Sequence, residues 1–131
     1  MTVFESKVRI NRPVSAVYQF LSDFNNHKQL MPDSITNWTS DRDSANFTVQ
    51  GMANLALKIS NRIENSSIII VPAADVPFNV DMRWVVVDLH DGTTEAVITL
   101  SAELNMMMKM MASGPLQKLV NQQTATLARV V

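Results

Sequence analysis

The sequence predicts an α+β domain with an antiparallel sheet of about seven strands, two short helices after the first strand, and a long C-terminal helix. Three observations support this class. Most of the chain before residue 105 alternates apolar and polar residues as strands do, two short helical patterns follow the first strand, and a helical apolar stripe occupies the last quarter. A helix with one apolar stripe buries that stripe against a sheet.

The composition describes a single domain over positions 1–131, long enough to form a core without cross-links. The chain has no cysteine, which excludes disulfides and thiolate metal sites and agrees with a reducing compartment. The first ten residues lack the apolar core of a signal peptide, and no apolar run approaches the roughly 20 residues that span a bilayer. We therefore expect a cytoplasmic protein without an integral membrane segment.

The net charge of −1 gives no reason to expect a nucleic-acid partner. The charges are unevenly distributed, because after Glu103 the chain has three basic residues and no acidic one. The basic residues are Lys109, Lys118 and Arg129. A solvated basic helix face is the simplest explanation, and a role at a membrane surface is the alternative.

The N-terminal part predicts one strand followed by two short helices. Residues 2–10 alternate, and the apolar face carries Phe4, Ser6, Val8 and Ile10. Pro13 suits the first turn of a helix, which the apolar spacing extends to about Ser22. Asp23 is a capping residue for a second short helix, and Pro32 ends it.

The middle of the chain predicts six further strands separated by turns. These strands cover 35–40, 45–50, 55–63, 67–71, 79–90 and 93–104. Gly51 indicates a bend or bulge, and Asp91-Gly92 indicates a hairpin turn. Two prolines make residues 72–78 a loop.

The last quarter of the chain opens with five methionines in six positions. They are Met106, Met107, Met108, Met110 and Met111. The Gly114-Pro115 pair predicts a break, which makes residues 105–114 a methionine-rich hinge or lid. The helix then follows, and its apolar stripe carries Leu116, Leu119, Val120, Gln123 and Leu127.

Residues 12–24, RPVSAVYQFLSDF, place a proline, an aromatic residue on the first helix and Asp-Phe before the second. With Leu30-Met31-Pro32 after the helix pair and Thr94 starting the last strand, this pattern resembles the START-like, or SRPBCC, superfamily. Its members include lipid-transfer domains and polyketide cyclases. The resemblance covers the whole chain and implies a helix-grip fold, in which a curved sheet wraps the terminal helix around an apolar cavity. Such a resemblance specifies the fold better than the function.

The first functional hypothesis is binding or transport of a hydrophobic or amphipathic small molecule in that cavity. An apolar guest gains roughly 25 cal/mol per Å² of surface removed from water, and a few polar groups fix its orientation. We expect the cavity wall to include Met82, Trp84, Leu100, Met107, Met110, Leu119 and Gln123. Gln123 is the expected polar contact, since a polar group on an inward stripe needs a partner.

Several of these residues also have purely structural interpretations. The methionines form either an adaptable lid or a filler where sheet meets helix. Gln123 bonds a ligand or water, or it bonds the sheet, or the helix is rotated enough to expose it. Trp84 is either cavity wall or core. Asn61 either points inward with its strand or lies beyond a bend.

No pattern in the sequence supports catalysis. The apolar strand faces carry no Asp, Glu, His or Lys in mid-strand, so we predict no catalytic residue. His27, which has polar neighbours in sequence, and His90 lack metal-ligand spacing, and no nucleotide-binding motif is present, so neither a metal nor a cofactor is expected.

Two alternative functions remain open. A polyketide cyclase or dehydratase-like enzyme requires an acid or base that points into the cavity. A protein-interaction or chaperone-associated module requires an exposed apolar patch around the methionines and a filled interior. A homodimer is also left open.

Overall fold

The computed structural model describes residues 1–51, 53–73, 75 and 78–131. Its elements, in chain order, are β1 (Thr2–Ile10), α1 (Val14–Leu21), α2 (Phe24–His27), the 3-10 helix η1 (Lys28–Leu30), β2 (Ile35–Ser40), β3 (Ser44–Val49), β4 (Ala53–Ile63), β5 (Ser67–Pro72), β6 (Val80–Asp88), β7 (Thr94–Ala102) and α3 (Met106–Val130). The predicted α+β class is confirmed, since α2 and η1 together form the second short helix. The predicted loop 72–78 lies partly outside the described residues, because Ala74, Val76 and Pro77 do.

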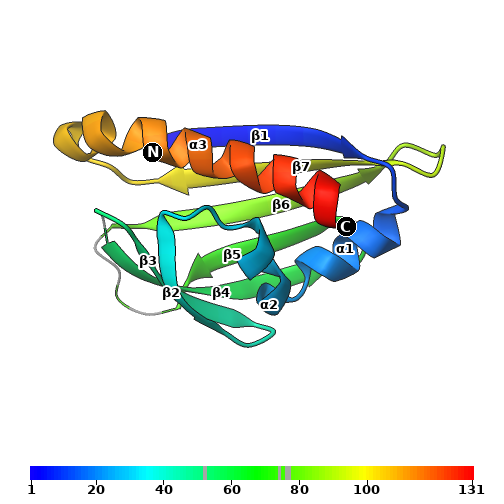
Figure 1. The fold of residues 1–131 in the computed structure, drawn as a ribbon, viewed down its shortest axis with the longest axis horizontal. Helices are drawn as coiled ribbons and strands as arrows, with labels where there is room; N and C mark the ends of the chain where they lie inside the picture. Colours follow the sequence, from blue (N-terminus) through cyan, green and yellow to red (C-terminus); the bar gives the residue numbers. More distant parts are fainter. Residues whose placement is uncertain (52, 74, 76–77) are drawn as a thin grey trace.

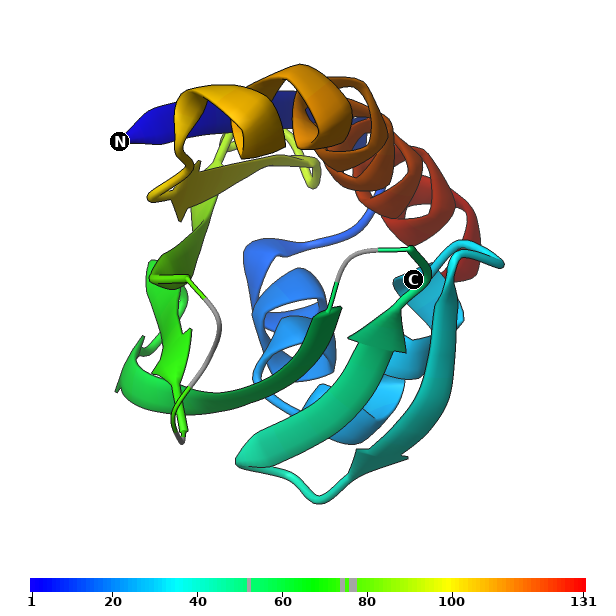
Figure 2. The ribbon, with the colours of Figure 1, turned by 90° about the vertical axis from the view of Figure 1, so that its left-hand side faces the viewer.

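The seven strands form one antiparallel sheet in the order β1-β7-β6-β5-β4-β3-β2 (Figure 1). Viewed from the end, the sheet curls into an open half-barrel, with α3 along one side and the short helices behind (Figure 2). The helix packs on β1 and β7 and also touches η1. The opposite edge of the sheet, β2 and β3, therefore curls round toward α3 from the other side.

A bulge in β4 decides which way the side chains beyond it point. The pairing register of β4 with β5 shifts between Ile59 and Asn61. Ile59 is therefore buried, whereas Asn61 is exposed, so the strand bends before Asn61 and does not aim it into the interior. Arg62 is the residue that turns inward instead. Its guanidinium donates to the backbone oxygen of Ser22 at 2.8 Å and pairs with Asp43 at 2.7 Å.

The junction of α1 and α2 is held by local caps. The Asp23 carboxylate accepts a hydrogen bond from the backbone N–H of Asn25 at 2.9 Å, which confirms the predicted cap. The interpretation of His27 as a residue in a polar neighbourhood is wrong. Its imidazole is fully buried, with its ring centroid 4.8 Å from that of Phe24. Four residues of helix are too few for the sequence to show which face is inward.

Helix α3 is continuous, so the predicted break at Gly114-Pro115 is wrong. Pro115 removes one backbone donor but lies between two residues that dock inward, Ala112 and Leu116. Tertiary packing on both sides of the pair maintains the helix through it. Asn105 caps the start of the helix, because its side chain accepts a hydrogen bond from the backbone N–H of Met108 at 2.8 Å. The methionines therefore belong to the first turns of α3 rather than to a separate hinge.

Candidate ligand-binding site

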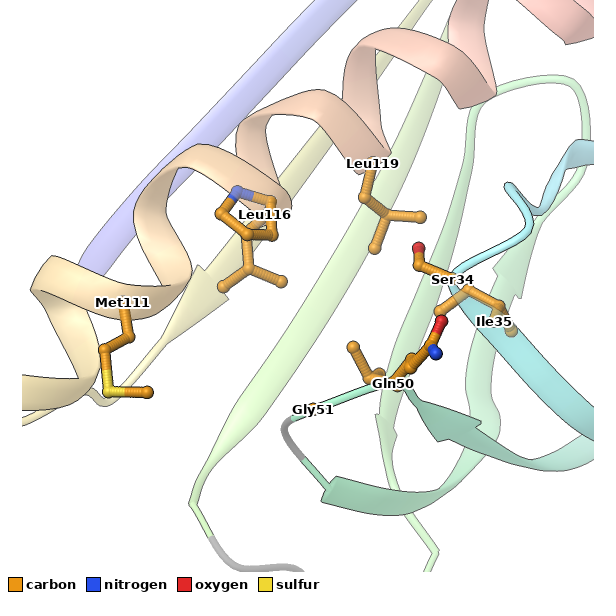
Figure 3. A pocket seen from close by; sticks show the side chains of 9 residues that line it. Ser34, Ile35, Gln50, Gly51, Met111, Leu116 and Leu119 are labelled. Carbon is orange, nitrogen blue, oxygen red and sulfur yellow. The ribbon is translucent and has the colours of Figure 1, made fainter.

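A pocket of about 130 Å³ lies between α3 and the ends of β2 and β3 (Figure 3). Its lining residues are Ser34, Ile35, Val49, Gln50, Gly51, Met111, Pro115, Leu116 and Leu119. Leu116 and Leu119 point from the helix toward two separate turns, one that carries Ser34 before β2 and one that carries Gln50 after β3. The pocket therefore has an apolar wall from the helix and polar groups opposite it.

A second, more open hollow of about 660 Å³ continues along the same side of α3. It is lined by Pro32, Asp33, Ser34, Pro115, Lys118, Leu119 and Gln122, three of which also line the first pocket. In this second hollow, the residues opposite the helix come from the segment between η1 and β2. The two hollows together form a groove along α3, which we call the α3 groove.

The interior behind the groove contains polar atoms without partners among the described residues. Gln123 is fully buried, and its amide donates only to the Met31 sulfur, at 3.6 Å. The Oε1 atom of Gln123 and the Nε1 atom of Trp84, also fully buried, have no hydrogen-bond partner there. A buried polar atom without a partner costs about 1–3 kcal/mol. Both atoms therefore lack the hydrogen bond that compensates for burial.

His27 is the buried titratable group of the described interior. Burial is the main cause that lowers the pKa of His27 from 6.5 to about 4, so the ring is neutral at neutral pH. Its Nε2 donates to the backbone oxygen of Leu21 at 2.7 Å. That bond leaves Nδ1 as an acceptor, and it has no partner among the described residues. His27 therefore adds a second free acceptor to the interior and no charge.

The structure places the predicted wall residues in two groups. Five are buried: Met82, Trp84, Leu100, Leu119 and Gln123. Met107 and Met110 are 72% and 82% exposed and line none of the hollows described above. Because residues 106–111 belong to the same continuous helix as Leu116 and Leu119, the helical repeat directs Met107 and Met110 toward solvent. Met111 is the methionine that lines the pocket. A ligand-binding role for all seven residues stays a prediction.

The sequence did not indicate the residues that complete the pocket on the sheet side. Ser34, Gln50 and Gly51 lie in turns, where side-chain periodicity gives no inward direction. Ile35 and Val49 are paired across β2 and β3, so one strand register brings them to the same place. The alternation of β3 indicates that the Val49 side chain points to the inner face of the sheet. It does not indicate which end of the strand lies near α3.

The methionine cluster is mostly an exposed surface. Met106, Met107, Met110 and Met111 are between 68% and 82% exposed, and Met108 packs against the core. The filler interpretation therefore holds for Met108 alone. Met111 combines exposure with a place in the pocket lining, which is what a flexible rim residue needs.

Ionised groups are absent from the buried set of the described residues. The buried polar side chains there are Ser22, His27, Ser67, Thr94, Gln123, Thr124 and Thr126. Over the same residues, no three His, Cys, Asp or Glu side chains gather in a way that could hold a metal ion. Nor does any helix in this part of the chain combine the length and hydrophobicity needed to cross a membrane.

Comparison with known proteins identifies the fold. No protein-family model and no curated protein matches the sequence. Among solved structures, a START superfamily protein from Mycobacterium smegmatis matches with a TM-score of 0.72 at 16% identity, over 98% of this chain and 99% of that one. A protein from Thermus thermophilus matches with a TM-score of 0.77 at 13% identity, over 98% and 95%.

A third match is the di-domain ARO/CYC protein BexL, with a TM-score of 0.67 at 10% identity, over 97% of this chain and 46% of BexL. Matches at this identity establish the fold alone. The chain therefore has the START-like helix-grip fold that residues 12–24 and the order of elements predict.

Proposed function

We propose that the protein binds a hydrophobic or amphipathic small molecule between α3 and the sheet, and that the guest enters through the α3 groove. The observation that carries this proposal is the pocket beneath Leu116 and Leu119 (Figure 3). These two side chains lie on the buried stripe of α3, yet they line an open space. An apolar guest in that space completes the burial of the stripe.

The energetics are adequate for a carrier. A guest that buries about 200 Å² of apolar surface gains about 5 kcal/mol from desolvation, before the cost of ordering it. A hydrogen bond to an unpaired buried atom adds about 1 kcal/mol. With one or two such bonds the total is about 6–7 kcal/mol before the ordering cost, which corresponds to binding weaker than micromolar, so a tighter complex needs a guest of larger apolar area.

Binding is favoured over catalysis by the chemistry of the lining. A cyclase-like reaction needs an acid or base at the reacting atoms. The charged residues of the α3 groove, Asp33 and Lys118, are both exposed, and His27 is neutral. The names of the START protein and of BexL support the idea of a small-molecule guest, but they do not supply an acid or base to this chain.

The proposal is tested with N-phenyl-naphthylamine, a neutral apolar dye whose fluorescence rises when it leaves water. Two methionine-to-tryptophan variants, both within the first turns of α3, make a matched pair. Met111→Trp places an indole at the pocket, whereas Met106→Trp places one on an 81% exposed position outside the hollows. We expect the first variant to weaken dye binding about fivefold or more and the second to leave it unchanged.

Equal affinities for both variants would place the dye elsewhere on the surface. A wild-type protein that does not enhance the dye at all, in repeated preparations extracted free of lipid, would remove the proposal.

A further inference from the structure

Trp84 and Gln123 belong to the same cross-section of the molecule. The strand register aligns Ser6 of β1, Ile98 of β7, Trp84 of β6 and Ile68 of β5 in one row across the sheet. The Ser6 hydroxyl lies 2.7 Å from that of Thr124, so α3 crosses this row next to Gln123. Ser6 and Trp84 are two strand spacings apart, about 10 Å. The two buried polar side chains therefore share one level of the fold.

The unpaired atoms at this level are complementary in kind. Trp84 Nε1 can only donate a hydrogen bond, and Gln123 Oε1 can only accept one. Both belong to fully buried side chains, and among the described residues neither atom has a partner. A hydroxyl group is the simplest group that satisfies both, because it accepts one hydrogen bond and donates another.

The surroundings discriminate against a charged guest. The buried side chains of the described residues include no Lys, Arg, Asp or Glu. A carboxylate placed here would lose its hydration without gaining an ion pair, and desolvation of an unpaired charge is costly. It would also meet the unpaired Gln123 Oε1 atom, an acceptor that cannot donate a hydrogen bond to it.

We propose that the guest is a neutral molecule with a hydroxyl group, which accepts a hydrogen bond from the Trp84 indole and donates one to the Gln123 carbonyl oxygen. This inference rests on the proposed function and adds the ligand class. A carboxylate at this level is disfavoured by its desolvation cost, whereas alcohols and phenols with an apolar body fit. A ketone satisfies Trp84 alone and leaves Gln123 unpaired.

Three probes of one shape test the ligand class by displacement of the dye at neutral pH. They are propylbenzene, para-propylphenol and para-propylbenzoate, which carry no polar group, a neutral hydroxyl and a negative charge. We expect the phenol to bind about tenfold more tightly than the hydrocarbon and the benzoate to bind most weakly. Failure of all three to bind overturns the proposed function together with this inference.

Equal affinity of phenol and hydrocarbon overturns the ligand class while the proposed function stands. That outcome indicates that water, or no group at all, meets the two atoms. Tightest binding of the benzoate also overturns it.

Variants assign the effect to the two residues. Gln123→Leu and Trp84→Phe each remove one polar atom, so each is expected to reduce the tenfold preference to about threefold or less. The control is Thr124→Val, next to Gln123, because the Thr124 hydroxyl already bonds Ser6. It is expected to keep the full preference.

The preference is a ratio measured within one protein, so a general loss of affinity does not change it. If Trp84→Phe does not fold, Gln123→Leu alone decides the matter. An unchanged preference in Gln123→Leu overturns the assignment.

Discussion

The two halves of α3 differ sharply, although they form one helix. The first half, residues 106–115, buries Ala112 and exposes four methionines. The second half, residues 116–130, buries seven side chains: Leu116, Leu119, Val120, Gln123, Thr124, Thr126 and Leu127. Side-chain hydrogen bonds from α3 to β1 begin at Gln117, which donates to the backbone oxygen of Glu5 at 3.1 Å.

The cause of the difference is the reach of the sheet. Thr2, the first residue of β1, pairs with Ala102, the last residue of β7. This end of the sheet therefore stops at Ala102, four positions before α3 begins at Met106. The first turns of the helix project beyond the strands (Figure 1). The second half is therefore held by the sheet, and the first half forms a rim beside the pocket. A single helix provides both a fixed wall and an adaptable entrance.

The largest expected effect tests this division of α3 directly. Leu127→Ala removes a fully buried side chain and is expected to lower the free energy of unfolding by about 2–5 kcal/mol. Met110→Ala, on the exposed half, is expected to change it by less than about 0.5 kcal/mol. Urea denaturation of the two variants measures both values. Comparable losses would mean that the first half is packed as firmly as the second.

The second effect concerns His27, on the helix α2 that runs into η1 beside α3. The folded pKa of about 4 lies below the unfolded value of 6.5. Between these pH values the unfolded chain binds a proton that the folded chain does not, so stability falls as the pH falls. The expected loss from pH 6.5 to pH 4 is about 3 kcal/mol.

A His27→Gln variant is the control, and its stability should hardly depend on pH within this window.

The pKa values of two surface carboxyl groups are shifted as well, but to a lower pH range. Hydrogen bonds, chiefly from the backbone of Asp43 and the side chain of Thr93 respectively, lower the pKa of Asp41 and of Asp91 below 3.8. The contribution of these two carboxylates to the free energy of unfolding is therefore lost only as the pH falls below about 3.8, outside the window used for His27. A wild-type stability that is flat between pH 6.5 and pH 4 would show that His27 is solvated.

Two adjacent substitutions in the second half are expected to act in opposite directions. Thr124→Val breaks the hydroxyl pair with Ser6 and should cost about 1 kcal/mol. Gln123→Leu removes a buried acceptor without a partner among the described residues, so it should leave stability unchanged or raise it by up to about 1 kcal/mol. Thermal unfolding without ligand compares them. A marked loss in Gln123→Leu would identify a structural hydrogen bond and remove Gln123 as a ligand contact.

The smallest effect sharpens the description of the first half. Gly114→Ala is expected to stabilise the protein by about 0.5–1 kcal/mol, because a Cβ at this helical position meets nothing within 4 Å. The gain should appear as slower amide exchange in residues 106–113. Destabilisation would instead show that the helix needs the freedom of glycine at this point.

Most of the fold was predictable because strand alternation and two short helical patterns are local signals. The prediction was wrong for the first half of α3. Gly114-Pro115 indicates a helix break unless the tertiary packing on both sides is known, and the break hid which side chains of residues 106–113 point outward. Burial of Gln123 followed correctly from its stripe. The bulge in β4 and the burial of His27 depend on neighbours distant in sequence, and so does the pocket, which joins residues 34–35, 49–51 and 111–119.

The most direct test of the central claim is a crystal structure of the protein with para-propylphenol. We expect the aromatic ring between α3 and the sheet, with the hydroxyl oxygen within about 3.2 Å of Trp84 Nε1 and of Gln123 Oε1. Phenol bound only on the outer surface, with the space beneath Leu116 and Leu119 closed by side chains, would contradict the claim.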